Sequence, residues 1–212
     1  MTPELVTVPD MAVAACERFL ALRPRTVVLA GGSTPRPLYQ RLADSEFPWS
    51  QTEVFFGDER CVPPDHPDSN YRMAKEALLS KVPARVHRMP AESCDAAAYE
   101  DELTQVFGQG LPAFDLVVLG LGEDGHTASL FTGDAALDER TRRVVRIQRP
   151  DHPRLTLTLS VLSAAKVALF LVAGAAKKEA LRRLLAKEDI PAARVTAEQV
   201  VIVADEAASP VR

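Results

Sequence analysis

Short runs of apolar residues recur along the chain and are rich in Val, Leu and Phe. They occupy residues 26–30, 54–56, 114–119, 155–159, 167–172 and 200–203. These runs do not alternate apolar with polar positions, a pattern typical of strands that helices cover on both faces. The sequence therefore predicts six buried strands.

Stretches with apolar residues at helical spacing lie between the apolar runs. They cover residues 11–22, 35–42, 73–79, 96–107 and 176–186. Candidate helix caps precede three of them, namely Ser33 or Thr34, Asn70 and Ser93. Strands that alternate with helices pair in parallel through right-handed crossovers. We expect an α/β, Rossmann-like fold in a single domain over residues 1–212, with an open, mostly parallel sheet and helices on both faces.

Composition and charge narrow the range of partners. The 212 residues are 47% hydrophobic and 25% charged, which indicates a folded domain rather than a disordered chain. The formal net charge is −4, so neither nucleic-acid binding nor a polybasic membrane surface is indicated. The longest apolar run, residues 167–176, is too short to span a bilayer, and the first residues carry no targeting signal. We expect a soluble cytoplasmic protein; the oligomeric state stays open, and a monomer is compatible with the sequence.

The three cysteines, Cys16, Cys61 and Cys94, are odd in number and form no Cys-x-x-Cys pair. A disulfide framework is typically an even set, and a zinc site typically shows paired Cys or His ligands. We therefore expect no disulfide framework, no metal site and a reducing compartment. No sequence motif indicates a cofactor.

Four of the predicted strands end in the same way, with glycine followed by polar residues. The segments are residues 30–34, 56–60, 119–126 and 172–177. In parallel α/β sheets, ligands bind outside the carboxyl ends of the strands. We expect these four loops to converge on one crevice, and we expect the Pro-rich residues 61–69 to form a loop at a strand end.

The first of these loops has the features of an anion site. Gly31 and Gly32 place no side chain in the turn, and the helix that follows offers free N–H groups and its positive dipole end. Ser33 and Thr34 add hydroxyl donors, and Lys177 adds a charge from the last loop. An ordinary strand-to-helix turn, in which a hydroxyl caps the helix and Lys177 is solvated, is the competing interpretation.

The third loop matches the Gly-x-Gly-x-x-Gly fingerprint of dinucleotide sites at residues 120–125. We reject that function because Glu123 and Asp124 would repel a pyrophosphate in the turn. Asp124 and His126 instead place a carboxylate and an imidazole at the crevice, where histidine is a natural general base. A surface histidine beside an Asp-Gly turn is the alternative for this pair. The other histidines receive no site role.

Charges of both signs follow the second strand, at residues 58–60. Arg60 is a candidate for holding a phosphate or a developing oxyanion, and Asp58 for orienting Arg60. A solvated run of charges is the competing interpretation. The chain has neither a Gly-x-Ser-x-Gly nucleophile motif nor a His-Glu-x-x-His metal motif.

Taken in order, five motifs make the chain resemble the 6-phosphogluconolactonases, within the wider glucosamine-6-phosphate isomerase/lactonase family. The motifs are LAGGSTP at 29–35, FGDER at 56–60 continuing to SNY at 69–71, LGLGEDGHTASLF at 119–131, RLTLT at 154–158 and VAGAAK at 172–177. They run almost end to end and are more specific together than singly. The resemblance implies a NagB-type fold and cofactor-free hydrolysis of 6-phospho-D-glucono-1,5-lactone to 6-phosphogluconate in the oxidative pentose phosphate pathway.

The resemblance also implies roles for single residues. His126 is the implied base that activates water, with Asp124 and Arg60 beside it in catalysis. Binding of the phosphate and sugar is implied for the remaining candidates, which are Gly31, Gly32, Ser33, Thr34, Asp58, Arg154 and Lys177. No metal takes part in this mechanism.

Two rival functions share parts of the pattern. Amino-sugar phosphate deaminases resemble this chain through Asp-Gly-His but continue Ala-Phe-Asn-Glu-Pro, whereas residues 128–132 here carry no carboxylate. A non-catalytic sugar-phosphate sensor would be expected to lack Asp124 or His126, and this chain has both. Thr132 stands where the lactonase pattern usually has Pro, so the loop that follows Phe131 is expected to differ in shape.

Overall fold

A seven-stranded parallel sheet forms the centre of the computed structural model, which describes residues 2–210. The strands lie in the order β1-β10-β9-β6-β2-β3-β5, and every neighbouring pair is parallel. Their bounds in this order are Glu4–Val8, Gln199–Asp205, Val167–Val172, Leu116–Gly120, Thr26–Leu29, Glu53–Phe56 and Arg85–Val86. All six residues of β9 are buried, as the unbroken apolar run predicts for a strand covered on both faces.

A second, antiparallel sheet packs beside the first and has the order β4-β8-β7, with bounds Asp58–Arg60, Arg154–Leu157 and Val144–Ile147. The apolar run 155–159 therefore does not join the parallel sheet, which corrects that prediction. Leu155, Thr156 and Leu157 are all fully buried. A short strand that is buried on both faces has the same sequence pattern in either sheet, so periodicity does not distinguish them.

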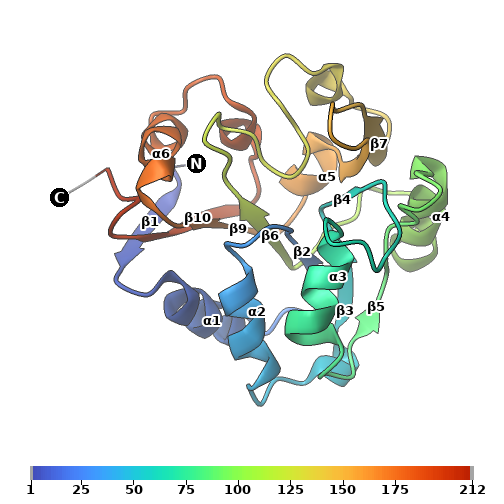
Figure 1. Cartoon of the computed structure of the whole chain (residues 1–212), viewed down its shortest axis with the longest axis horizontal. Coiled ribbons are helices and arrows are strands. Elements are labelled where there is room, and N and C mark those ends of the chain that lie inside the picture. Colours follow the sequence, from blue (N-terminus) through green and yellow to red (C-terminus); the bar gives the residue numbers. More distant parts are fainter. Residues whose placement is uncertain (1, 211–212) are drawn as a thin grey trace.

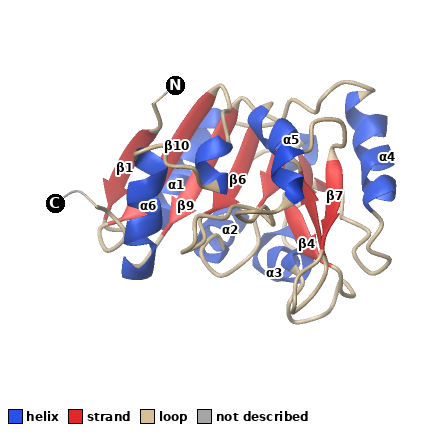
Figure 2. Ribbon diagram, turned by 90° about the horizontal axis from the view of Figure 1, so that it is seen from above, coloured by secondary structure: helices blue, strands red, loops and turns tan. Residues whose placement is uncertain are grey.

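Six α-helices of the described part of the chain flank the sheets: α1 Met11–Leu22, α2 Arg36–Ala43, α3 Asn70–Ala74, α4 Ala96–Phe107, α5 Leu159–Ser163 and α6 Lys178–Leu185. Helices α1, α2 and α3 lie on one face of the parallel sheet, and α5, α6 and the small sheet lie on the other (Figures 1 and 2). A π-helical turn, Lys75–Leu79, continues α3, and a 3-10 helix, Ala175–Lys177, leads into α6. Helices on both faces and an open, mostly parallel sheet confirm the predicted fold class.

The helix caps differ from those predicted. Ser69 caps α3 by accepting from the Arg72 amide at 3.1 Å, and Asn70 is the first residue inside that helix. Asp95, rather than Ser93, caps α4. Helix α2 follows Pro35 and has no side-chain cap bond, so neither Ser33 nor Thr34 serves as a cap.

A disulfide joins Cys61 to Cys94, contrary to the sequence expectation. Their Cα atoms lie 5.1 Å apart, within the range that disulfides require. Cys61 comes directly after β4, and Cys94 lies in the loop before α4. Cys16 on α1 stays free, so the odd count concealed one pair, which only the packing of the two loops brings together.

The Pro-rich residues 61–69 form a loop after β4, as predicted. Between residues 2 and 210, no helix is both long and apolar enough to cross a lipid bilayer.

Candidate functional site

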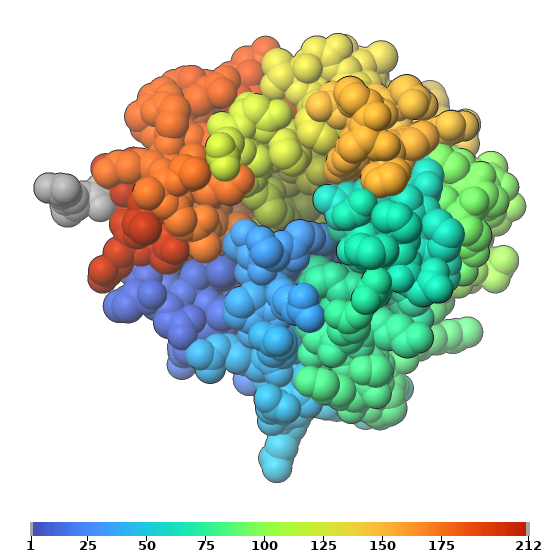
Figure 3. All heavy atoms as spheres, viewed as in Figure 1, coloured from blue at the N-terminus to red at the C-terminus, as the bar shows by residue number. Residues whose placement is uncertain are grey.

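A cavity of about 240 Å³ opens at the carboxyl ends of β2, β6 and β9. Figure 3 shows it as a hollow in the middle of one face, between segments drawn in blue, teal and yellow-green. Nine of the ten predicted site residues line it, namely Gly31, Gly32, Ser33, Thr34, Asp58, Arg60, His126, Arg154 and Lys177. Asp124 is not among the lining residues. The predicted convergence of the four loops is therefore confirmed.

The loop after β2 presents unused donors to this cavity. Within residues 2–210, the hydroxyls of Ser33 and Thr34 have no hydrogen-bond partner, and the helix that follows has no side-chain cap. Buried Tyr39 on α2 holds the start of the loop, because its hydroxyl donates to the Ala30 carbonyl at 2.8 Å and accepts from the Ala30 amide at 2.9 Å. Two hydroxyls and a free helix N-terminus are suitable for binding an anion.

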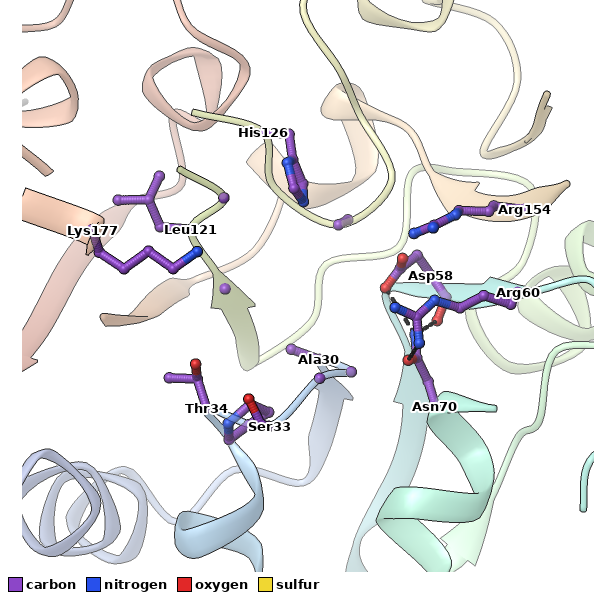
Figure 4. A pocket seen from close by; sticks show the side chains of 16 residues that line it. Ala30, Ser33, Thr34, Asp58, Arg60, Asn70, Leu121, His126, Arg154 and Lys177 are labelled. Atoms are coloured by element: carbon purple, nitrogen blue, oxygen red, sulfur yellow. Dashed lines mark hydrogen bonds between the residues drawn. The ribbon is translucent and has the colours of Figure 1, made fainter. Parts of the chain in front are cut away.

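Lys177 approaches the cavity from the end of the 3-10 helix that follows β9. Its side chain is 24% exposed, and its ammonium lies 3.8 Å from the nearest carboxylate, that of Glu123. Figure 4 shows it on the same side of the cavity as Ser33 and Thr34. The long and partly exposed ion pair leaves the ammonium available to a bound anion.

Two arginines from the small sheet line the opposite side (Figure 4). Arg60 on β4 pairs in register with Arg154 on β8. Arg60 Nη1 donates to the Asp68 carbonyl at 2.8 Å and to Asn70 Oδ1 at 3.0 Å, and Arg154 Nη2 donates to Asp151 at 2.5 Å. The Nε atom of each arginine is buried and has no hydrogen-bond partner among the described residues. Two guanidinium groups that line one side of a cavity favour a ligand that carries oxygen acceptors.

Asn70 connects this side of the cavity to the first loop. Its Nδ2 donates to the Asp58 carboxylate at 3.2 Å and to the Asp58 carbonyl at 2.9 Å, while its Oδ1 accepts from Arg60. A Cβ on Gly31 would lie 1.9 Å from Asn70 Oδ1, so this approach requires glycine at 31. Asp58 does not bond to Arg60 directly. Its other oxygen accepts from buried Ser129 at 2.6 Å, and it acts on Arg60 only through Asn70.

Buried Glu59 holds the segment that carries Asn70. Its carboxylate accepts four bonds, from the amides of Arg60, Asn70 and Tyr71 and from the Ser69 hydroxyl. Burial raises the pKa of Glu59, and the four hydrogen bonds oppose that shift. The carboxylate thereby ties the end of β4 to the start of α3.

His126 and Asp124 form a pair in the loop after β6. Asp124 Oδ1 lies 2.6 Å from His126 Nδ1 and also accepts from the His126 amide at 3.1 Å. A Cβ at Gly122 would lie 2.1 Å from Nδ1, so only glycine permits this packing. With Nδ1 bonded to a carboxylate, Nε2 is left with its lone pair for the cavity.

The electrostatics of this pair are consistent with an ionised carboxylate. Burial raises the pKa of Asp124, but its bonds to the His126 amide and imidazole outweigh that effect, and the net pKa is lowered. The His126 side chain is 33% exposed, and its ring packs against the Phe131 ring with the two ring centroids 4.6 Å apart. Asp124 therefore supports the imidazole from outside the cavity.

Sequence reasoning missed two residues of this site. Asn70 lines the cavity and was expected only as a cap, while Glu59 was expected only within a run of charges. The SNY motif at 69–71 marked the segment without indicating a role. The bonds between 58–60 and 69–71 are tertiary, and no local spacing predicts them.

Comparisons with known proteins identify the family of this chain. The family model "Glucosamine-6-phosphate isomerases/6-phosphogluconolactonase" matches residues 8–203. The 6-phosphogluconolactonase of Synechocystis is 47% identical over 176 residues, covering 78% of this chain and 73% of that protein. That of Thermotoga maritima is 40% identical over 177 residues, covering 78% and 77%.

Solved structures of the same kind superpose closely. The crystal structure of the 6-phosphogluconolactonase from Thermotoga maritima matches with a TM-score of 0.87 and 30% identity over 96% of this chain and 100% of that chain. A monomeric glucosamine-6-phosphate deaminase matches with a TM-score of 0.83 at 19% identity, which shows the shared fold alone. The chain belongs to the glucosamine-6-phosphate isomerase/6-phosphogluconolactonase family.

Proposed function

We propose that the protein hydrolyses 6-phospho-D-glucono-1,5-lactone to 6-phospho-D-gluconate, the lactonase step of the oxidative pentose phosphate pathway. One observation carries the proposal. An imidazole held through Nδ1 by a carboxylate shares its cavity with two arginines whose Nε donors have no partner. The lactonases among the relatives support the choice of substrate.

In this mechanism, His126 Nε2 takes a proton from a water molecule as the water oxygen bonds to lactone C1. The former carbonyl oxygen gains negative charge, which Arg60 and Arg154 stabilise by donating to it. The bond from C1 to the ring oxygen then breaks, and the imidazolium returns its proton to that oxygen. Asp124 orients the imidazole ring of His126 and stabilises its protonated form without taking the proton.

The phosphate end of the substrate binds on the other side of the cavity in this proposal. Lys177 supplies the charge, and the Ser33 and Thr34 hydroxyls and the N-terminus of α2 supply donors. This assignment places the reacting carbonyl near the two arginines and separates binding of the anion from the chemistry.

The rival functions differ from this one in their residue requirements. A deaminase or isomerase needs a further carboxylate after Asp-Gly-His, and residues 128–132 supply none. A non-catalytic sensor needs the anion loop alone, and the geometry of His126 with Asp124 would then have no purpose.

A coupled assay tests the proposal. Glucose-6-phosphate dehydrogenase generates the lactone in situ, and spontaneous hydrolysis is subtracted. We expect catalysed hydrolysis of the phosphorylated lactone and a much lower kcat/KM for unphosphorylated gluconolactone. Equal kcat/KM for the two lactones would contradict the anion site. If neither lactone is hydrolysed, the protein is better explained as a non-catalytic sugar-phosphate sensor.

The proposed function also has consequences for cofactors, partners and location. Catalysis needs no metal or organic cofactor in this mechanism, so EDTA is expected to leave kcat unchanged. The substrate is a small molecule, and we expect neither a nucleic-acid nor a membrane partner. We propose that the protein is a monomer, which a sedimentation measurement tests. A cytoplasmic location suits a phosphorylated sugar, whereas the disulfide is unusual for a reducing compartment. Trapping free thiols in intact cells tests the location.

A further inference from the structure

We propose that His66, Asp68 and His152 form a binding site for one divalent transition-metal ion of the zinc class, outside the catalytic cavity. Each residue offers one ligand atom, and the three atoms lie within 4.8 Å of one another. None of the three residues lines the cavity that holds His126. The site therefore has its own ligand set and adds to the lactonase function without replacing any part of it.

The tertiary structure builds this cluster from two distant segments. His66 and Asp68 lie in the loop after β4, and His152 lies just before β8. Antiparallel pairing of β4 with β8 brings the segments together, and the Cys61 amide donates to the Pro153 carbonyl at 2.8 Å. A metal here would connect the two loops that lead to Arg60 and Arg154.

The distances fit a small metal ion with modest adjustment. His152 Nε2 lies 3.1 Å from Asp68 Oδ2, and His66 Nδ1 lies 3.8 Å from the same oxygen. In a tetrahedral zinc site with bonds of about 2.0–2.1 Å, ligand atoms are about 3.3–3.4 Å apart. Coordination through His66 Nδ1 would replace one bond, which this atom accepts from the Asp68 amide at 3.1 Å.

The Asp68 carboxylate pairs with the two imidazoles and with no other charged side chain of the described residues. Among residues 2–210, no Arg or Lys pairs with the Asp68 carboxylate, whose only ion-pair partners are the two imidazoles. The nearby guanidinium of Arg60 bonds to the Asp68 carbonyl instead. The two rings contact each other edge to face at 5.6 Å. Although the chain is rich in arginine, the two imidazoles are therefore the partners of this carboxylate.

The ligand chemistry selects the metal and its role. Two imidazole nitrogens with one carboxylate oxygen suit Zn²⁺, Co²⁺ or Ni²⁺, whereas Mg²⁺ and Ca²⁺ prefer oxygen ligands. The residues are exposed or half-buried, so water completes the coordination. Because none of the three ligand residues lines the catalytic cavity, the metal stabilises the two loops and takes no part in hydrolysis.

Metal binding to tag-free, EDTA-stripped protein tests the proposal. We expect about one Zn²⁺ per chain by calorimetry, and a Tm that rises by about 5–10 °C when free Zn²⁺ is one hundred times its Kd. His66→Ala and His152→Ala should lose the binding and the Tm rise, and Asp68→Asn should weaken both. His126→Ala is the matched control and should keep both, because it removes a half-buried imidazole that also pairs with a carboxylate but is no ligand of the proposed site.

Substitution with Co²⁺ adds a signal independent of activity and of thermal stability. Visible absorption of tetrahedral strength should appear in the wild type and in His126→Ala, and it should be absent in His152→Ala. Circular dichroism of the stripped variants confirms that each is folded. Absence of stoichiometric binding in the wild type, or binding that only His126→Ala abolishes, would overturn the proposal and leave only a hydrogen-bonded cluster of side chains in its place. The lactonase assay fails or succeeds separately from either result.

Discussion

The two sides of the cavity are built differently. The parallel-sheet side consists of the loop after β2 and Lys177, and its polar groups have few partners within the protein. The small-sheet side consists of Asp58, Arg60, Asn70 and Arg154, and its groups bond to one another and to buried neighbours. His126 lies between them in the loop after β6 (Figure 4).

In the proposed mechanism, this difference separates two tasks, binding of the phosphate and stabilisation of the oxyanion. A phosphate brings its own charge and acceptors, so loosely held donors bind it well. A developing oxyanion needs donors that are already in place, because reorganisation during the reaction costs rate. The comparison therefore predicts that substitutions on the parallel-sheet side alter KM. Substitutions of His126 or of residues on the small-sheet side are predicted to alter kcat or the free energy of unfolding.

The largest effect is expected for His126→Ala. Loss of the base should lower kcat by about 10²–10⁴-fold, the usual range for a positioned acid or base, with little change in KM. The acid limb of the pH profile of kcat/KM should vanish with the imidazole. Steady-state kinetics on the folded variant measure both effects. A rate near that of the wild type would return His126 to an incidental surface histidine.

Breaking the disulfide should destabilise the small-sheet side. Cys61 and Cys94 are 33 residues apart, and opening a loop of that length costs about 3–4 kcal/mol in the chain-entropy model. Denaturant unfolding of Cys61→Ser measures the change, and Cys16→Ser is the matched control because Cys16 is free. Equal losses for the two variants, or three free thiols by mass spectrometry in the wild type, would contradict the pairing.

Lys177→Ala tests the parallel-sheet side. Removing the charge opposite the phosphate should weaken binding by about 2–3 kcal/mol and raise KM with kcat nearly kept. The same variant should treat unphosphorylated gluconolactone as the wild type does. A fall in kcat for both lactones would mean that Lys177 acts on the reacting end, and the two sides would then exchange roles.

Glu59→Gln should loosen the small-sheet side from within. The new amide nitrogen cannot accept from the donors that now surround the carboxylate, and leaving buried donors unpaired costs about 1–3 kcal/mol. We expect a lower free energy of unfolding and a reduced kcat/KM through Asn70 and Arg60. Unchanged stability would show that Glu59 does not hold the segment.

The smallest effect is expected for Asp124→Asn. The imidazole keeps a neighbour but loses the charge that stabilises its protonated form, so kcat should fall by about ten-fold, less than in His126→Ala. The lowered pKa of Asp124 adds stability above its ordinary value of 3.8, and that stability is lost as the pH falls through the lower folded value. The stability difference from wild type should therefore shrink in acid, which unfolding curves at several pH values measure.

The sequence by itself determined five of the seven strands of the parallel sheet, and the loops that follow them. Unbroken apolar runs have one common explanation, burial on both faces, and glycine after such a run marks a strand end at which ligands bind. These local signals placed β2, β6 and β9 and brought nine of ten candidate residues to one cavity. Strands β1, β4, β5 and β7 gave no comparable signal, because they are short, lie at edges or carry many polar residues.

The tertiary structure alone decided the rest. Antiparallel pairing of β4 with β8 joins residues almost a hundred positions apart, and it brings Arg60 beside Arg154 and His66 beside His152. Tertiary packing also brings Cys61 to Cys94 and Glu59 to the start of α3. Such contacts depend on how two segments pack rather than on the spacing within either one. Local pattern thus reports which residues are buried, whereas only the folded chain reports which polar groups become partners.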